Sequence, residues 1–367
     1  GNARTVLYEA GQIGSAYDQF QKDGWFDGVK VDRYGRKEAY CILKPGLAYN
    51  QKGDVIKANN VLHCGRFETP QSPRGLSAFI HAVDHLLDIR EIDNDTKRGI
   101  KAGDRVAMLL GNRNEFVVTL FALAHLGAIA VPISIREQAP GLAYMLSHCA
   151  AVMVVHEAEL AHLLPSSAEA PDLKRRVAVS ACEGSETFAD LLEDGEVPPV
   201  QEVVEEETAV ILYTSGTTGR PKGAMLTHLG IVHSSLHYQM AMGLTATDAS
   251  IAAVPLSHVT GLIALITTLT LAAGKLVIMP SFKAAEFLVL AEREGMTHTL
   301  MVPAMYNLCL REPAFGSMAL QHWRIGGYGG APMPVSVIEL LAHHLPQLDL
   351  RNAYGATETT SPTTLMP

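Results

Sequence analysis

Residues 213–223 read Tyr-Thr-Ser-Gly-Thr-Thr-Gly-Arg-Pro-Lys-Gly, and no other segment of the chain is as informative. A short apolar, strand-like run (209–213) leads into the segment, and a helical pattern starts near His228. Glycines let a backbone approach a ligand closely, and successive N–H groups in such a loop form a concavity that binds anions. Threonine and serine hydroxyls add donors, and Lys222 adds a positive charge suited to phosphate oxygens. The segment therefore predicts a phosphate-binding loop rather than a plain surface turn.

The loop differs from the Walker A sequence, G-x-x-x-x-G-K-[ST]. Lys222 does not follow a glycine, and neither serine nor threonine follows it. A Walker-type NTPase or a small-molecule kinase is therefore disfavoured.

Outward from the loop, short apolar runs alternate with helical patterns from about residue 100 onward. Examples are the strand-like runs 106–110 and 299–302 and the helical stretches 115–126 and 335–344. Such alternation predicts an α/β fold with largely parallel sheets that helices cover on both faces. The most apolar stretch, 261–279, contains Gly-Lys near its middle, so we expect a buried helix and a buried strand there rather than a membrane span.

The composition narrows the class of protein. Of 367 residues, 48% are hydrophobic and 18% are charged, which is a globular balance. The net charge of −9 disfavours non-specific binding to nucleic acids or anionic membranes. The five cysteines are scattered without CxxC spacing, so we expect no disulfide framework or zinc site and favour the reducing cytoplasm. Residues 1–20 lack the apolar core of a signal peptide.

Two stretches suggest boundaries between parts of the chain. Residues 65–75 are rich in glycine and proline, and residues 183–207 are acidic and contain two adjacent prolines. We therefore expect an N-terminal segment of unknown role (1–70), a first α/β subdomain (71–205) and an ATP- and acyl-binding α/β subdomain with the phosphate loop (206–367). Residues 1–65 contain weak β-like runs that do not match the later rhythm.

A second informative segment, residues 352–359, reads Asn-Ala-Tyr-Gly-Ala-Thr-Glu-Thr and follows a strand-like run. Tyr354 offers an aromatic face, and Gly355 permits a tight turn. Thr357 offers a donor, and Glu358 offers the hard oxygen that Mg²⁺ prefers. Taken alone, Glu358 would fit an N-cap or a surface carboxylate equally well.

Two further segments also follow strand-like runs. Residues 326–334 read Gly-Gly-Tyr-Gly-Gly-Ala-Pro-Met-Pro, and residues 255–261 read Pro-Leu-Ser-His-Val-Thr-Gly. The first lacks the third glycine of a dinucleotide-binding fingerprint. In the second, His258 alone would more often be a structural histidine than a ligand-binding one.

Together, in their order and approximate spacing, the four segments resemble the acyl-adenylate-forming superfamily of acyl-CoA synthetases, non-ribosomal peptide adenylation domains and firefly-type luciferases. The resemblance covers residues 75–367 and is greatest to acyl- and aryl-CoA ligases. It implies the large N-terminal domain of that fold, with helix-flanked sheets in layers. It also implies a carboxylate that attacks the α-phosphorus of ATP, followed by transfer of the acyl group to CoA, with Mg²⁺ as the cofactor.

The resemblance implies a set of site residues as well. Catalytic roles fall on Thr214, Lys222, His258 and Glu358, and Glu358 is the implied metal ligand. The implied nucleotide-binding residues are Thr214, Ser215, Gly216, Thr217, Thr218, Gly219, Lys222, Gly330, Ala331, Pro332, Asn352, Ala353, Tyr354, Gly355 and Thr357. The implied acyl pocket contains His258, Val259, Tyr328, Gly329 and Gly330.

The expected substrate class follows from the residue types that are absent from the segments expected around the acyl group. Amino-acid-activating relatives place an aspartate near residues 251–263, and none occurs there. Residues 233–243, 259–263, 302–305 and 328–331 contain no arginine or lysine, which disfavours a dicarboxylic acid. We therefore expect a small-molecule hydrophobic acid. A carrier protein or an amine as acyl acceptor is an open alternative, and no feature indicates an oligomeric state.

The chain stops soon after the Thr-Glu pair, at Pro367. The family normally continues with an aspartate for the ribose hydroxyls, a hinge and a small lid domain that carries a catalytic lysine. As given, the chain is therefore expected to comprise an incomplete large domain that binds nucleotide weakly and has little activity. If the native chain ended here, a non-catalytic nucleotide-binding remnant would be the better interpretation.

Overall fold

The computed structural model describes residues 99–192, 200–214 and 219–366, together with the backbone of residues 25–26, 29–31, 37–42 and 54–57. The chain divides into two compact units, residues 1–85 and 86–367. In the first unit, four strands pair in chain order as an antiparallel sheet: β1 (Trp25–Phe26), β2 (Val29–Val31), β3 (Lys37–Ile42) and β4 (Asp54–Lys57). The predicted linker at 65–75 lies outside the described residues.

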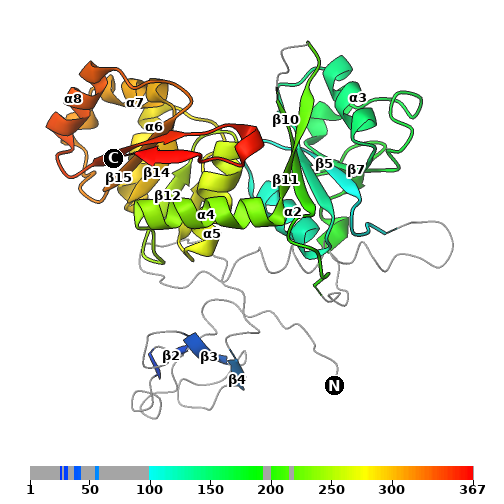
Figure 1. Ribbon diagram of the computed structural model, residues 1–367, viewed down its shortest axis with the longest axis horizontal. Helices are drawn as coiled ribbons and strands as arrows, with labels where there is room; N and C mark the ends of the chain where they lie inside the picture. Colours follow the sequence, from blue (N-terminus) through cyan, green and yellow to red (C-terminus); the bar gives the residue numbers. More distant parts are fainter. Residues whose placement is uncertain are drawn as a thin grey trace. The chain divides into compact units, whose positions relative to one another are not determined.

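The second unit contains a seven-stranded sheet (Figure 1). Its strands are β5 (Arg105–Leu109), β6 (Ile129–Pro132), β7 (Ala151–His156), β8 (Arg175–Ala178), β9 (Glu186–Thr187), β10 (Thr208–Thr214) and β11 (Lys222–Thr227), in the order β11-β10-β6-β5-β7-β8-β9. All neighbours are parallel except β10 and β11, which form a hairpin. The helices of this part are α2 (Asn114–His125) and α3 (Ala139–His148), with short 3₁₀ turns at Ala158–Leu163 and Asp190–Leu192.

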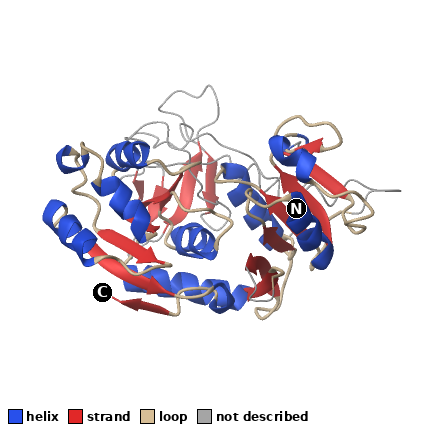
Figure 2. Ribbon diagram, turned by 90° about the horizontal axis from the view of Figure 1, so that it is seen from above, coloured by secondary structure: helices blue, strands red, loops and turns tan. Residues whose placement is uncertain are grey.

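A six-stranded sheet follows in the same unit. Its strands are β12 (Ala249–Ala252), β13 (Lys275–Ile278), β14 (His298–Met301), β15 (Ile325–Gly329), β16 (Asp349–Tyr354) and β17 (Thr364–Met366), in the order β13-β12-β14-β15-β16-β17. Only the β16–β17 pair is antiparallel. The helical elements are α4 (His228–Met242), the π-helical η6 (Thr260–Thr267), α5 (Thr268–Leu271), α6 (Ala284–Glu294), α7 (Pro303–Leu310) and α8 (Val335–His344), with short 3₁₀ turns at Phe315–Ser317 and Thr357–Thr359 (η8). Figure 2 shows helices on both sides of the strands, so the predicted α/β class with largely parallel, helix-flanked sheets is confirmed.

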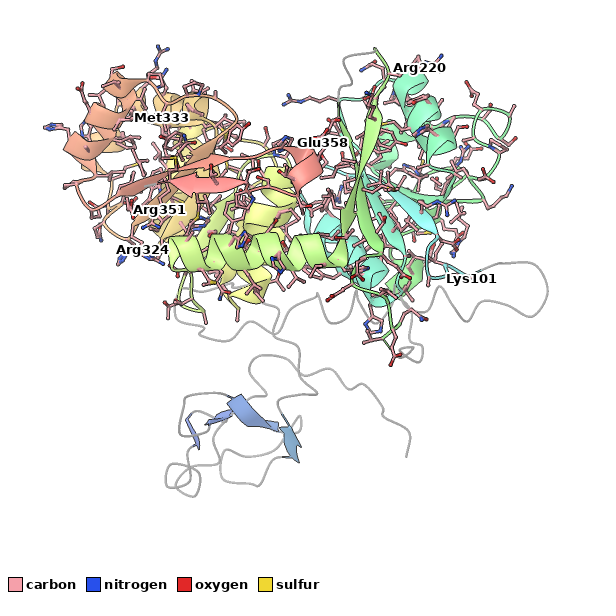
Figure 3. All side chains as sticks on the ribbon, viewed as in Figure 1. Lys101, Arg220, Arg324, Met333, Arg351 and Glu358 are labelled. Carbon is pink, nitrogen blue, oxygen red and sulfur yellow. The ribbon has the colours of Figure 1, made fainter. Side chains whose placement is uncertain are left out.

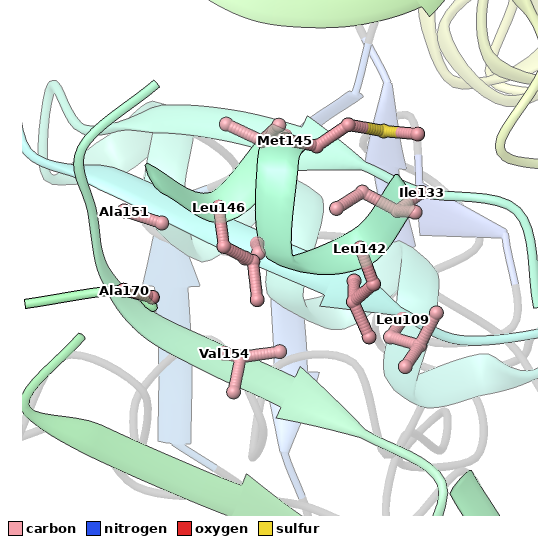
Figure 4. Close-up of a cluster of buried hydrophobic side chains, with 10 residues drawn as sticks. Leu109, Ile133, Leu142, Met145, Leu146, Ala151, Val154 and Ala170 are labelled. Atoms are coloured by element: carbon pink, nitrogen blue, oxygen red, sulfur yellow. The ribbon is translucent and has the colours of Figure 1, made fainter. Parts of the chain in front are cut away.

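The core of the seven-stranded sheet lies between α3 and the central strands. Leu142, Met145 and Leu146 are spaced three and four residues apart, which places them on one face of the helix. They pack against Leu109 of β5 and Val154 of β7, and all five side chains are buried (Figure 4). Burial of one such side chain contributes about 1.5–3 kcal/mol, so this face fixes α3 against the sheet.

Both faces of β5 are covered, as its continuous apolar sequence predicts. Ala107 and Leu109 belong to the α3 cluster, whereas Val106 and Met108 point to the opposite face because side chains alternate along a strand. Val106 and Met108 are also fully buried, and α2 contacts β5 and β6. A strand with two buried faces is typical of a parallel sheet between helix layers.

Three elements differ from the sequence-based expectations or refine them. The hairpin of β10 and β11 belongs to the seven-stranded sheet, so the boundary between the sheets does not coincide with the predicted boundary at residue 205. Residues 222–227 form a strand that the sequence did not predict. Among the described residues no helix has the length and apolar character to cross a membrane. The apolar stretch 261–279 forms the predicted buried helical segment, but the strand that follows it, β13, is half-buried rather than buried.

Candidate active site

The two ends of the phosphate loop are held together by the β10–β11 hairpin. Thr214 is the last residue of β10 and lies directly opposite Lys222, the first residue of β11. Directly opposite residues of an antiparallel pair project to the same face of a sheet, so the threonine hydroxyl and the lysine ammonium share one face. Gly219 has φ +85°, a left-handed conformation that favours glycine. The predicted residues Ser215, Gly216, Thr217 and Thr218 lie outside the described residues.

The end of β10 is anchored to α3 by Tyr213. Its hydroxyl donates to the Met145 carbonyl at 3.2 Å and lies 2.8 Å from Nδ1 of His148. Burial raises the pKa of Tyr213, so the hydroxyl keeps its proton and remains a donor. Arg220, within the loop, lies over the ring of Tyr144 of α3, 5.7 Å from its centroid. Through these contacts α3 supports the strand that ends at Thr214.

The Thr-Glu segment after β16 is held by its own hydrogen bonds. The Thr359 hydroxyl donates to the Ala356 carbonyl at 2.9 Å, and the Ala356 N–H donates to the Thr359 hydroxyl at 3.2 Å. The N–H of Thr363 donates to the Tyr354 carbonyl at 2.8 Å. Glu358 lies inside this closed turn, so its backbone position is fixed before any ligand binds.

The same segment is attached to α4. The hydroxyl of the buried Tyr238 lies 3.2 Å from Oγ of Ser361. A Cβ added at Gly230 would lie 3.1 Å from Oγ1 of Thr360, and one at Gly355 would lie 2.8 Å from Oγ of Ser361. Distances this short are tighter than normal packing, so a larger residue at either glycine would have to displace a hydroxyl of the turn.

The phosphate loop and the Thr-Glu segment meet at one hydrogen bond. The Thr214 hydroxyl donates to Oε1 of Glu358 at 3.3 Å, across 144 residues of sequence. The turn that carries Glu358 also contacts β11, whose first residue is Lys222. Figure 3 shows Glu358 at the junction with β10 and β11, whereas Arg220 lies at the far tip of the hairpin. The structure therefore brings three of the four predicted catalytic residues, Thr214, Lys222 and Glu358, into one region.

The remaining predicted nucleotide-binding residues lie at the carboxyl edge of the six-stranded sheet. Five parallel strands end at this edge, where open α/β sheets bind their ligands. Residues on the last positions of β15 and β16, or directly after them, are Tyr328, Gly329, Gly330, Ala331, Pro332, Asn352, Ala353, Tyr354, Gly355 and Thr357. Tyr354 is 69% exposed, so its ring face is open to a ligand. Gly330 has φ +76°, and a Cβ at Gly329 would lie 2.5 Å from the Ala353 carbonyl.

The fourth predicted catalytic residue, His258, follows β12 at the same edge. The residue is exposed overall, but the surrounding chain partly buries its imidazole, and this partial burial lowers the pKa of His258. The Thr260 N–H donates to Nδ1 of His258 at 3.2 Å. Nδ1 is therefore an acceptor, which leaves the neutral ring with its proton on Nε2. Val259, the next predicted acyl residue, is buried.

A shallow cavity of about 440 Å³ lies elsewhere, at the start of β8 and β9. Arg175 in its wall pairs with Glu186 at 2.6 Å, and Arg176 donates to the Pro165 carbonyl at 2.7 Å. Both arginine side chains already have partners within the protein, so we assign this cavity no ligand.

Sequence reasoning missed Asn112, which lies between β5 and α2. Its side chain makes hydrogen bonds to Val254, Leu256 and Met279, all close to the ends of β12 and β13. A single asparagine after a strand is an ordinary turn residue. Because its partners lie far away in the sequence, no local pattern could have identified it.

The geometry agrees with the comparisons to known proteins. The AMP-binding enzyme family matches residues 96–367. The long-chain-fatty-acid–CoA ligase FadD13 of Mycobacterium tuberculosis is 30% identical over 78% of this chain and 56% of its own length, and a feruloyl-CoA synthase of Amycolatopsis is 31% identical over 71% and 50%. The chain thus spans about half the length of the curated relatives it matches.

Solved structures agree as well. An inhibitor-bound N-terminal domain of FACL13 from Mycobacterium tuberculosis has a TM-score of 0.70 at 26% identity, covering 80% of this chain and 71% of that one. An anthranilate CoA ligase, AuaEII, in complex with anthranoyl-AMP has the same fold, with a TM-score of 0.70 at 21% identity over 78% of this chain and 55% of its own. This chain therefore belongs to the AMP-binding enzyme family, within the acyl-adenylate-forming superfamily, and is similar to its acyl- and aryl-CoA ligases.

Proposed function

We propose that the protein is an acid–thiol ligase that activates a hydrophobic carboxylic acid with ATP and transfers the acyl group to CoA. The observation that carries the proposal is the contact between Thr214 and Glu358, with Lys222 directly opposite Thr214. It brings the phosphate loop to the carboxyl edge where Tyr354 and His258 are exposed. A donor, a cation, a carboxylate and an aromatic face together match the parts of a bound nucleotide.

The first half-reaction forms an acyl-adenylate and releases pyrophosphate. The acid's carboxylate oxygen bonds to the α-phosphorus of ATP while the bond to the pyrophosphate oxygen breaks. Such a transfer needs positioning and neutralisation of charge rather than covalent help from the protein. We assign Lys222 and the loop to the β- and γ-phosphates, Thr357 to the α-phosphate and Tyr354 to adenine.

The donor set suits a magnesium ion that arrives with the nucleotide. Mg²⁺ usually binds through one or two carboxylates together with substrate phosphates and water. Glu358 is an exposed carboxylate beside Thr214, and the described residues contain no cluster of three or more His, Cys, Asp or Glu side chains. Glu358 would therefore hold the ion, whose chemistry is to neutralise the departing pyrophosphate.

The acid would bind beside the predicted acyl residues, which are His258, Val259, Tyr328, Gly329 and Gly330. A neutral imidazole with its proton on Nε2 can donate a hydrogen bond to a carboxylate oxygen. The names of the relatives, a long-chain-fatty-acid ligase and a feruloyl-CoA synthase, support a hydrophobic acid. In the second half-reaction the CoA sulfur bonds to the acyl carbon, and AMP leaves.

We also assign the reaction to the cytoplasm. In the described part of the chain Cys149, Cys182 and Cys309 are free thiols. Unpaired cysteines without a disulfide framework are typical of reducing compartments.

Acid-dependent exchange of labelled pyrophosphate into ATP tests the first half-reaction, and CoA-dependent release of AMP tests the second. Both are to be measured in the protein expressed from its complete reading frame, with a chain-length series of fatty acids and a set of aryl acids. We expect exchange with hydrophobic acids and AMP release that requires CoA. Pyrophosphate exchange together with AMP release that does not require CoA would refute the ligase and favour a carrier protein or an amine as acceptor. ATP binding without exchange would favour a non-catalytic role.

A further inference from the structure

Asn112 lies in the part of the unit that contains the seven-stranded sheet. All the hydrogen bonds of its side chain, however, go to backbone groups at the ends of two strands of the six-stranded sheet. Its amide nitrogen donates to the carbonyls of Val254 at 2.9 Å and Met279 at 3.0 Å, with a longer contact of 3.4 Å to Ala252. Its amide oxygen accepts the N–H of Leu256 at 2.9 Å. One side chain thus satisfies backbone groups just beyond both β12 and β13.

The turn that Asn112 holds leads directly to His258. The N–H of His258 donates to the Pro255 carbonyl at 3.2 Å, and the N–H of Leu262 donates to the His258 carbonyl at 2.9 Å. On the other side of the turn, a Cβ added at Gly261 would lie 2.3 Å from the Pro255 oxygen, so no other residue fits without a backbone shift. The position of the imidazole is therefore set by Asn112 on one side and by Gly261 on the other.

We infer that Asn112 is a positioning residue for the acid site, which acts by holding the turn of His258 against the seven-stranded sheet that carries the phosphate loop. The inference rests on the proposed function. A neutral amide supplies two N–H donors for the carbonyls and an oxygen acceptor for an N–H, whereas a hydroxyl supplies one donor. An aspartate would turn a second anionic oxygen toward the Val254 and Met279 carbonyls. Because all of its partners are backbone atoms of the turn and its neighbouring strand, a change here displaces His258 while the nucleotide contacts of Glu358 and Tyr354 remain.

The test uses the full-length protein and acid-dependent pyrophosphate exchange, with KM for acid, KM for ATP and kcat measured separately. The variants are Asn112→Asp, Asn112→Ser, His258→Ala and the two double variants. Asn114→Ala is the matched control, because Asn114 is an exposed asparagine two residues away. We expect Asn112→Asp to lower kcat/KM for the acid about tenfold or more, since small misplacements of reacting groups have large effects, with KM for ATP within about twofold of wild type.

The double variants distinguish positioning from general stabilisation. If Asn112 acts through His258, its substitution should lower acid kcat/KM by less than about twofold in the His258→Ala background, because coupled residues are non-additive. The inference would be overturned if the effects of the Asn112 and His258 substitutions on acid kcat/KM multiplied in the double variants. It would also be overturned if KM for acid and KM for ATP changed equally, or if Asn112→Asp left the enzyme unchanged. Asn112→Ser retains one donor and one acceptor and serves as the readout if the aspartate variant does not fold. Absence of exchange in the wild type would instead refute the proposed function, and the inference with it.

Discussion

The two edges of the six-stranded sheet differ in how their polar groups are used. At the amino edge, the buried Asp248 accepts from Arg324 at 2.8 Å, from the Thr297 hydroxyl at 2.7 Å and from the Thr245 N–H at 2.8 Å. Lys275, the first residue of β13, pairs with Glu294 at 2.7 Å. Asp248, Thr297 and Arg324 directly precede β12, β14 and β15, and the Lys275 N–H donates to the Asp248 carbonyl at 2.8 Å, so one network connects the starts of four strands.

The carboxyl edge of the same sheet is open by comparison. Tyr354, Glu358 and His258 are exposed there, and so is the segment 330–332. Figure 3 shows Arg324 well away from Glu358 on the same sheet. We therefore propose that stability and ligand binding depend on opposite edges, as parallel strands allow because all their carboxyl ends meet at one side. Substitutions at the amino edge should change stability, and those at the carboxyl edge should change binding.

The largest effect is expected from Asp248→Ala. Removing the buried carboxylate deprives Arg324, the Thr297 hydroxyl and the Thr245 N–H of their shared acceptor, and loss of one partner of a buried pair costs about 3–5 kcal/mol. Because Arg324 is 40% exposed, we expect the lower end, a fall of about 3 kcal/mol in the free energy of unfolding. Urea denaturation followed by fluorescence of the buried Trp323, in a Trp25→Phe background, measures it.

The control for this edge is Asp349→Ala. Asp349 is 41% exposed and pairs with Arg351 at 2.5 Å, so its removal should change the free energy of unfolding by less than about 1 kcal/mol. MgATP affinity of the folded Asp248→Ala protein should remain within about twofold of wild type. A larger loss of affinity than of stability would contradict the separation of the two edges.

Acid should weaken the amino edge through His298, which begins β14. Burial, despite the nearby Asp248 carboxylate, lowers the pKa of His298 to about 4. The unfolded chain takes up this proton below about pH 6.5, whereas the folded chain does not. The stabilisation is therefore complete above pH 6.5 and decreases as the pH falls toward 4, by up to about 3 kcal/mol.

Denaturation curves between pH 7 and 4.5 test this slope. His298→Gln has no titrating side chain here, so the difference between wild type and variant should shrink as the pH falls. A constant difference across this range would contradict a neutral, buried His298. Asp248 acts at lower pH: hydrogen bonds from Arg324, Thr297 and Thr245 outweigh burial and lower its pKa, so its contribution is lost only as the pH falls below about 4.

The sequence predicted central strands such as β5 and β7 well because they are apolar on both faces. Such runs differ clearly from the intervening helical patterns, as with β5 and α2. It also identified residues at the carboxyl edge, because glycine, threonine and lysine cluster in short segments there. It did not predict β11, whose exposed Lys222 and Met225 give no regular alternation.

Contacts between distant segments could not be predicted in the same way. Asn112 bonds to groups 140–167 residues away, and the Thr214–Glu358 bond spans 144. Residues 326–329 include three glycines and nevertheless lie in β15. Glycine has low strand propensity, yet β15 needs it, because a Cβ at Gly329 would lie 2.5 Å from the Ala353 carbonyl of β16. Tertiary packing overrides local preference at this position.

At the carboxyl edge, Lys222→Ala and Glu358→Gln should weaken MgATP binding without unfolding the protein. Charged hydrogen bonds contribute about 1.5–3 kcal/mol, which corresponds to a rise in Kd of about 10- to 100-fold. Both side chains are exposed, so the free energy of unfolding should change by less than about 0.5 kcal/mol. Isothermal titration calorimetry with MgATP measures the affinity.

The matched controls for these variants are Lys283→Ala and Glu286→Gln. Lys283 and Glu286 form an exposed ion pair at the start of α6, with side chains 67% and 61% exposed. Both variants should bind MgATP as the wild type does. Unchanged affinity in both Lys222→Ala and Glu358→Gln would refute the assignment of the nucleotide site to this edge.

The smallest expected effect is that of Tyr354→Ala, which tests the adenine position alone. Stacking of a base on an aromatic side chain contributes about 1–3 kcal/mol, and a ring that is 69% exposed should be at the lower end, a rise in Kd for MgATP of about fivefold to tenfold. Tyr354→Phe retains the ring and should bind within about twofold of wild type. Magnesium tripolyphosphate has no base, so its affinity should be equal in all three proteins. If Tyr354→Ala weakened the binding of tripolyphosphate as much as the binding of ATP, the tyrosine would act by holding the turn of Glu358 rather than by stacking. That result would contradict the assignment of adenine to the exposed ring of Tyr354.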